Sequence, residues 1–137
     1  MALILVVDDH PGVRAVIRRA LEEVGHEVVL AVDGVTGLAA FYQLATQRAP
    51  DLVLVDRFMP EMDGLQLARQ LKVLARGMPV VLMSGDPVWL REELRDAVLN
   101  PAAYHTLVKP FTPEALVMAV ALALRPPPPG RQQDTAS

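Results

Sequence analysis

The chain has 137 residues, 52% of them hydrophobic and 21% charged, and its formal net charge is −3. This length and apolar content suit one domain with its own core and exclude an intrinsically disordered chain. The absence of cysteine excludes disulfides and thiolate metal sites. The sequence also lacks a membrane-spanning apolar run, a signal peptide and the basic footprint of a nucleic-acid-binding protein. We therefore expect a cytoplasmic domain that contacts neither membrane nor nucleic acid directly.

Short apolar runs recur along the chain, and several are apolar throughout until they reach polar residues. Such runs are typical of strands that are covered on both faces. The weakest of them is the last. The expected strands are residues 2–7, 27–32, 51–56, 78–86 and 104–109.

Apolar residues at helical spacing follow each run, with start and stop signals. Pro11 stands where a first helical turn tolerates proline, with Asp9 or His10 near the cap position, and Gly25 closes that helix. Thr112 is the expected cap of the last helix, with Pro113 at its first position. The expected helices are residues 11–24, 35–45, 64–75, 87–99 and 113–125.

Five alternations of strand and helix predict an α/β fold, with a parallel sheet between two layers of helices. We expect one domain over residues 1–125. Residues 126–137, "PPPPGRQQDTAS", cannot extend the last helix and are expected to form a proline-rich, disordered tail.

Polar residues stand where the expected strands end. They are Asp8 and Asp9 after the first strand, Asp56 in the third, Ser84 in the fourth and Lys109 in the fifth. Ligands of open parallel sheets bind at the carboxyl ends of the strands, so we expect these side chains to share one edge. Three neighbouring carboxylates repel one another unless a cation joins them, and oxygen ligands favour a hard divalent ion such as Mg²⁺.

A lysine and a hydroxyl beside carboxylates and a metal are suited to receiving an oxyanion. The set therefore describes a site at which Asp56 accepts a phosphoryl group. Taken singly, each residue has an ordinary interpretation: Asp9 and Asp63 as helix caps, Ser84 as a strand-end hydroxyl, Lys109 as a solvated loop residue. Their combination at one edge indicates the site, and we assign Asp63 to a turn outside it.

The segments that carry these residues resemble the receiver domain of bacterial two-component response regulators. Asp8-Asp9, "DRFMPEMDG", "LMSGD" and "LVKPF" occur in the family's order, and the resemblance covers residues 2 to about 125. It implies a single doubly wound, flavodoxin-like (βα)5 domain whose five-stranded parallel sheet has the order 2-1-3-4-5.

The resemblance also implies roles for individual residues. Asp56 would accept phosphate from a sensor histidine kinase or a phosphotransfer protein. Ser84 would hydrogen-bond one phosphoryl oxygen, Lys109 would pair with another, and the bond before Pro110 would be cis. The implied ligands of Mg²⁺ or Mn²⁺ are Asp8, Asp9, Asp56 and the backbone carbonyl of Phe58. Phosphorylation would then signal to a protein target through a conformational change, without enzymatic turnover.

One position departs from the family pattern. Three residues before the lysine, where the family usually has a Tyr, Phe or His switch, this chain has Thr106. Tyr104 lies two residues earlier, on the same strand face. We expect hydroxyl coupling between Ser84 and Thr106 to remain and the conformational change on phosphorylation to be small.

Other functions remain as alternatives. A degenerate receiver would act as a protein-binding module without phosphorylation. A phosphatase of the haloacid dehalogenase type needs a second acid where this chain has Phe58, and an FMN carrier needs a phosphate loop less acidic than "DDHPGV".

If 137 residues are the whole protein, the chain is a stand-alone receiver; if it is a fragment of a larger regulator with an output domain, the prolines begin a linker.

The last helix is apolar all round. Residues 115–124 include no polar side chain, whereas a helix on a sheet needs only one apolar stripe. We expect Leu116, Val120 and Ala123 to face the sheet. The side chains expected to face outward are Val117, Ala121 and Leu124. We therefore predict a hydrophobic partner surface, or a homodimer, through helix 113–125. The alternative is an exposed, alanine-rich face without a partner.

Overall fold

The structure, a computed structural model, describes residues 1–59, 61–86, 88, 92 and 105–125. Its elements are β1 (Leu3–Val7), α1 (Pro11–Glu23), β2 (Glu27–Ala31), α2 (Gly34–Ala45), β3 (Leu52–Asp56), α3 (Gly64–Leu74), β4 (Val80–Ser84), β5 (His105–Val108) and α5 (Pro113–Leu124). All five predicted strands and four predicted helices are confirmed. The helix expected at 87–99 lies almost wholly outside the described residues, as do Tyr104 and the tail expected at 126–137.

The strands form one parallel sheet in the order β2-β1-β3-β4-β5, as the family resemblance implied. Every residue of β1, β3 and β4 is buried, whereas β2 and β5 lie at the edges and are only partly buried. The three central strands are covered on both faces, which is why their sequences are almost continuously apolar.

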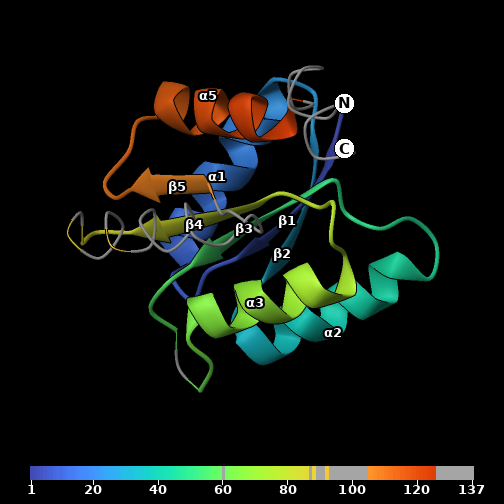
Figure 1. Cartoon of the computed structure of the whole chain (residues 1–137). Helices are drawn as coiled ribbons and strands as arrows, with labels where there is room; N and C mark the ends of the chain where they lie inside the picture. The colour runs from blue at the N-terminus through green and yellow to red at the C-terminus, as the bar shows by residue number, and fades with distance from the viewer. Residues whose placement is uncertain (60, 87, 89–91, 93–104, 126–137) are drawn as a thin grey trace, which may run out of the picture.

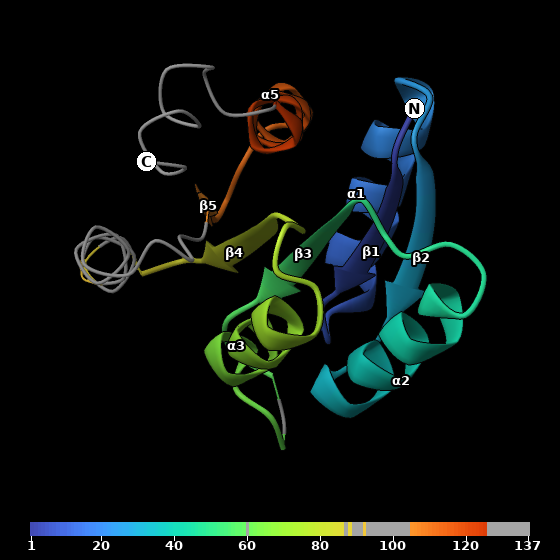
Figure 2. The same cartoon turned by 45° about the vertical axis from the view of Figure 1, so that its right-hand side comes forward.

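Helices cover both faces of the sheet. Figures 1 and 2 show α1 and α5 together on one side and α2 and α3 together on the other. Along β1, Ile4 and Val6 belong to the hydrophobic cluster under α1 and α5, whereas Leu5 and Val7 belong to the cluster under α2 and α3. With both faces covered, the strand ends are where a ligand can approach the sheet.

Helix ends follow the predicted signals. The Asp63 side chain accepts a 2.8 Å hydrogen bond from the Leu65 N–H at the start of α3, and Thr112 caps α5. At α1 the structure selects His10 as the N-cap, without a capping bond from its side chain. Asp9 therefore lies one residue outside the helix and does not cap it.

The outward face of α5 differs from the prediction. The side chains predicted to face the sheet, Leu116, Val120 and Ala123, are buried. Of those predicted to face outward, only Ala121 is exposed; Val117 and Leu124 are half-buried, and Leu124 packs against the core. The exposed large side chains are Met118 and Leu122 instead. Because the helix is apolar all round, its sequence does not show which side chains outside this buried stripe stay exposed.

In the part of the chain that the structure describes, no helix is long and apolar enough to cross a membrane.

Candidate functional site

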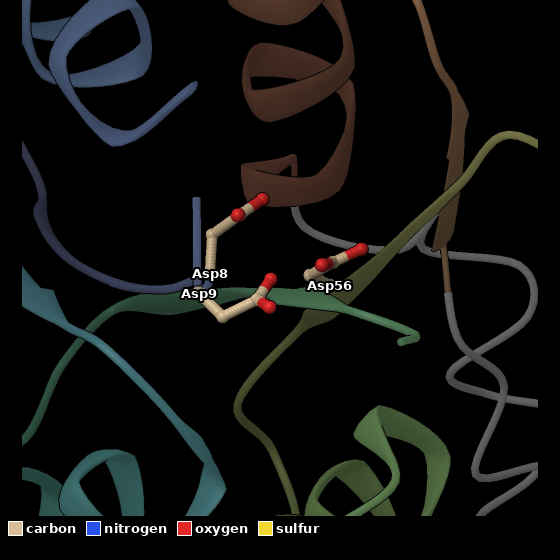
Figure 3. A group of neighbouring side chains, drawn as sticks. All are labelled: Asp8, Asp9 and Asp56. Atoms are coloured by element: carbon tan, nitrogen blue, oxygen red, sulfur yellow. The ribbon is translucent and has the colours of Figure 1, made fainter. Parts of the chain in front are cut away.

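Three carboxylates meet where β1 and β3 end. Asp8 and Asp9 directly follow β1, and Asp56 is the last residue of β3. One oxygen of each lies within 4.8 Å of the others, and Figure 3 shows the three side chains gathered at this edge. Asp8 and Asp56 are buried, whereas Asp9 is exposed. The structure thus brings together all three acids that the sequence predicted to share a site.

Asp8 is held through both its backbone and its side chain. Its N–H donates to the carbonyl of Ala31 at the end of β2 (3.2 Å), and its Oδ1 accepts from the His10 N–H (2.8 Å). The guanidinium of Arg14, in the first turn of α1, donates a 2.7 Å bond to the Asp8 carbonyl. Sequence reasoning missed this role of Arg14, since nothing in its spacing separates it from the other arginines of α1.

Lys109 enters the site from the loop after β5. Its Nζ lies 2.9 Å from Asp8 Oδ2 and 3.1 Å from Asp56 Oδ1. Its backbone N–H donates to the carbonyl of Ser84 (2.8 Å), which ties the ends of β4 and β5 together. The peptide bond between Lys109 and Pro110 is cis, as expected.

Burial and the neighbouring charges shift the pKa values of Asp56 and Lys109. Burial raises the pKa of Asp56, the charge of Asp8 raises it further, and Lys109 opposes both, leaving the pKa at about 6. Burial lowers the pKa of Lys109, but its bonds and charge interactions with Asp8 and Asp56 outweigh burial, and the net shift is upward. Lys109 therefore stays charged at neutral pH, while Asp56 ionises near pH 6.

Ser84 and Thr106 lie on neighbouring strands. Ser84 pairs in register with Val108, and Thr106 pairs with Leu82, so alternation puts both hydroxyl residues on the same face of the sheet. Ser84 is buried, and its Oγ accepts a 3.0 Å bond from the Asp86 N–H. A hydroxyl that accepts such a bond still has its own hydrogen to donate, so Ser84 can also bind an anion.

The loop after Asp56 turns sharply back to the strand. The Arg57 N–H donates to the carbonyl of Met83 (2.9 Å), and the Gly64 N–H donates to the carbonyl of Arg57 (2.8 Å). A Cβ on Gly64 would overlap the Asp56 carbonyl, so a glycine is required at this close approach. The Arg57 guanidinium lies 4.1 Å from the centroid of the Phe58 ring, which is 60% exposed. Sequence reasoning identified neither the stacking of Arg57 nor the close approach of Gly64.

The donor set fits a hard divalent cation. Its ligand atoms are carboxylate oxygens, and two of the three acids are removed from water, where an uncompensated negative charge is costly. Lys109 supplies one positive charge against three acids. A divalent ion held by Asp8, Asp9 and Asp56 would neutralise the remainder, with the Phe58 carbonyl as a further candidate ligand.

An apolar pocket of about 430 Å³ adjoins this site. Val13 and Val16 from α1 line it together with Phe111, and Lys109 lies at its boundary. The pocket is therefore adjacent to the acidic site, because Lys109 lines the pocket and also contacts Asp56.

Comparisons with known proteins agree with this geometry. The family model of the response regulator receiver domain matches residues 4–121. The response regulator MprA of Mycobacterium sp. (strain KMS) is 35% identical over 134 residues, which are 96% of this chain and 54% of that protein. MprA of Mycobacterium avium (strain 104) is 36% identical over 124 residues, 89% of this chain and 50% of that protein. The chain thus spans about half the length of these relatives.

Solved structures are similar over nearly the whole chain. The chemotaxis protein CheY4 of Vibrio cholerae is 28% identical with a TM-score of 0.76, and the match covers 90% of this chain and 98% of that one. The receiver domain of NtrX from Brucella abortus is 33% identical with a TM-score of 0.74, covering 88% of this chain and 97% of that one.

Proposed function

The chain belongs to the response regulator receiver domain family of two-component systems, and on that premise we propose that it accepts a phosphoryl group on Asp56. The donor is the phosphohistidine of a sensor histidine kinase or of a phosphotransfer protein. The observation that carries this proposal is the contact of the Lys109 ammonium with both Asp56 and Asp8 at one strand edge, next to Asp9. The phosphorylated chain then signals to a protein target.

The transfer makes one bond and breaks one. An oxygen of the ionised Asp56 carboxylate forms the new O–P bond while the N–P bond of the phosphohistidine breaks, and its electron pair stays on the imidazole. Asp56 is ionised for this attack because its pKa of about 6 lies below neutral pH. Lys109 balances the charge that moves onto the equatorial phosphoryl oxygens, and Ser84 donates its hydroxyl hydrogen to one of them. The product is a modified chain, so no turnover is involved.

Asp8, Asp9 and Asp56 would hold Mg²⁺ or Mn²⁺ together with the Phe58 carbonyl. When bound, the ion supplies positive charge close to the phosphoryl oxygens. The residues of this chain contribute its placement: Asp8 is fixed by His10 and Ala31, and Asp56 by the end of a buried strand.

The conformational response to phosphorylation passes through Ser84 and Thr106. Once Ser84 and Lys109 bind phosphoryl oxygens, the ends of β4 and β5 are drawn toward Asp56, because the Lys109 N–H already bonds the Ser84 carbonyl. Thr106 is small and half-buried, so no large ring has to move. The resulting conformational change is small, and Thr106 is the position through which it passes along β5.

The apolar pocket beside Lys109 receives the phosphodonor. A donor has to bring its histidine to Asp56, and the pocket lined by Val13, Val16 and Phe111 offers apolar contact on that side. A helix that carries a phosphohistidine and neighbouring apolar residues fits this surface.

A second copy of the chain is the partner we propose for the outward face of α5. Met118 and Leu122 are exposed there one helical turn apart. Sedimentation at increasing concentration, with and without phosphorylation, tests the homodimer. Leu122→Glu is expected to abolish association, and a wild-type chain that stays monomeric in all conditions contradicts it.

Intact mass spectrometry after incubation with acetyl phosphate and Mg²⁺ tests the phosphoacceptor. We expect one added phosphoryl group on the wild type and none on Asp56→Asn or in the presence of EDTA. An equal adduct on Asp56→Asn would refute the assignment of the acceptor. A wild-type chain that forms no adduct and shows no response to Mg²⁺ and beryllofluoride would favour a binding module that works without phosphorylation.

A further inference from the structure

The loop between β3 and α3 carries Phe58 and is held at two points. After β3, the Arg57 carbonyl accepts a hydrogen bond from the Gly64 N–H. Two residues before Gly64, the Met62 side chain is half-buried and packs against the hydrophobic cluster under α2 and α3. Between these points Glu61 has a φ of 71°, a left-handed conformation that is costly for a residue with a side chain. The packing of Met62 therefore contributes to holding the loop in a conformation it would not adopt alone.

Met62 lies directly against Gly34, the first residue of α2. A Cβ on Gly34 would stand 2.6 Å from Met62 Cβ and 2.9 Å from its Sδ, closer than non-bonded carbon and sulfur atoms approach. The start of α2 is fixed by a capping box, in which Asp33 Oδ1 accepts a 2.7 Å bond from the Thr36 N–H. Because the helix start is fixed, a side chain at position 34 would push Met62, and with it the loop, outward.

The segment of residues 31–34 also contacts the backbone of Asp8. The Ala31 carbonyl, three residues before Gly34, accepts the backbone hydrogen bond of Asp8. Residues 31–34 therefore connect the end of β1, which carries Asp8 and Asp9, to the loop that follows Asp56. Displacement of Met62 by a side chain at position 34 would therefore change the spacing between these two parts of the site.

We propose that Gly34 and Met62 are positioning residues for the metal site. Their contact holds the loop so that the Phe58 carbonyl and the Asp8 and Asp9 carboxylates reach one cation. Both residues act through the loop rather than as ligands. This inference rests on the proposed function, since it requires that a divalent ion bind at Asp8, Asp9 and Asp56.

Calorimetric titration of the unphosphorylated chain with Mg²⁺ tests the proposal without any measurement of phosphotransfer. Gly34→Ala is expected to raise the dissociation constant for Mg²⁺ by about tenfold, the usual lower bound for residues that support metal ligands. Gly77→Ala is the matched control, because a Cβ at Gly77 meets nothing within 4 Å. This control should bind Mg²⁺ as the wild type does.

Met62→Ala is the second variant, since it removes the contact without forcing a clash. It should raise the dissociation constant for Mg²⁺ in the same direction, by up to about tenfold. Melting in EDTA is measured beside each titration. A contact that served folding alone would lower the melting temperature in EDTA and leave the dissociation constant of the folded protein unchanged.

The outcomes separate the two proposals. A wild-type chain that binds no Mg²⁺ refutes the proposed metal site and this inference with it. A wild-type chain that binds Mg²⁺, with unchanged affinity in Gly34→Ala and Met62→Ala, leaves the proposed function standing and overturns the role of Gly34 and Met62. Weaker binding in both variants, with Gly77→Ala unchanged, supports it.

Discussion

The Nζ of Lys109 donates a 2.9 Å hydrogen bond to Asp8 Oδ2 across 101 positions of the sequence. Between β5 and β1 in the sheet lie β4 and β3, so the lysine side chain reaches across two strand ends. On the way its ammonium also contacts Asp56, at 3.1 Å. One cation therefore joins two buried carboxylates that no local spacing connects, and the strand order makes the contact possible.

Replacing Lys109 by Met should destabilise the chain strongly when divalent ions are removed. Methionine has a similar length but no charge, so Asp8 and Asp56 would lose their counter-charge while still buried. Loss of one partner of a buried ion pair typically costs about 3 kcal/mol. Without Lys109, which lowers the pKa of Asp56, this carboxyl takes up a proton more readily, and the cost falls to about 2 kcal/mol. Urea unfolding in EDTA measures the loss, and millimolar Mg²⁺ should recover most of it.

Lys72→Met is the control for this loss. Lys72 is also a half-buried lysine, but its Nζ donates to the carbonyl of Met78 and not to a carboxylate. Its replacement should cost about 1 kcal/mol, with no recovery in Mg²⁺. Equal losses for the two variants, or no recovery of Lys109→Met in Mg²⁺, would contradict the role of Lys109 as counter-charge of the acids.

Asp56→Asn should stabilise the chain in EDTA at pH 7.5 and not at pH 4. The pKa of Asp56 is about 6 in the folded chain against 3.8 for an ordinary aspartate, so the folded state binds its proton more tightly. The stability that protonated Asp56 contributes is complete below pH 3.8 and is lost as the pH rises through 6. Asparagine does not titrate, so it does not lose stability as the pH rises. The free energy of unfolding of Asp56→Asn at pH 7.5 should therefore exceed that of the wild type by about 2 kcal/mol.

Urea unfolding across pH 4 to 8 measures this gain, with Asp33→Asn as control. Hydrogen bonds from the Thr36 N–H and hydroxyl lower the pKa of Asp33. Asp33 thus contributes stability above its ordinary pKa that is lost as the pH falls, so its replacement should give no gain at pH 7.5. A flat difference between wild type and Asp56→Asn over the whole range would show that Asp56 is not strained by burial.

Much of this fold could be predicted from the sequence because its strands are short and continuously buried. "LVLVD" and its counterparts in β1 and β4 leave no polar residue inside the strand, so each change to Asp or Ser marks a strand end. The position of Asp56 beside Asp8 and Lys109 then follows from parallel topology together with the strand order that the family resemblance implied. The sheet-facing side of α5 was predicted correctly, but its exposed side chains were not, because Met118, Leu122 and Leu124 are equally apolar.

Close approaches of glycines could not be predicted for a different reason. Gly64 was expected only as the first residue of a helix, yet its missing Cβ is what lets α3 begin against the carbonyl of Asp56. Contacts of this kind depend on distances between segments that the chain brings together only on folding. The role of Arg14 could not be predicted for the same reason, because its hydrogen bond to the Asp8 carbonyl depends on the position of α1 relative to the end of β1.

Gly64→Ala should destabilise the chain and impair phosphorylation together. The new Cβ would overlap the Asp56 carbonyl and the Arg57 backbone, so the end of β3 or the start of α3 has to shift. Overpacking against a backbone costs about 3 kcal/mol, and the shift moves Asp56 away from Lys109. Thermal melting and the initial rate of acetyl phosphate labelling measure both effects. Gly77→Ala should change neither, and wild-type behaviour of Gly64→Ala would show that the loop tolerates the displacement.

Val16→Asp should impair phosphorylation by a protein donor and spare phosphorylation by acetyl phosphate. Val16 is 50% exposed on α1 and lines the apolar pocket beside Lys109, so a charge there meets the apolar surface proposed for the donor without disturbing the core. The chain is labelled with an autophosphorylated histidine kinase that phosphorylates the wild type, and in parallel with acetyl phosphate.

The control for Val16→Asp is Val73→Asp, a substitution at a valine that is 79% exposed on α3, on the other face of the sheet. The rate with the kinase should fall by about tenfold or more in Val16→Asp, as for a charge introduced at the centre of an interface, and stay unchanged in Val73→Asp. Equal losses with both donors would mean that Val16→Asp disturbs the acidic site itself. If the rate with the kinase falls equally in both variants, the pocket beside Lys109 is not the docking surface. A donor that is equally sensitive to Val73 and Val16 does not bind specifically on the side of α1.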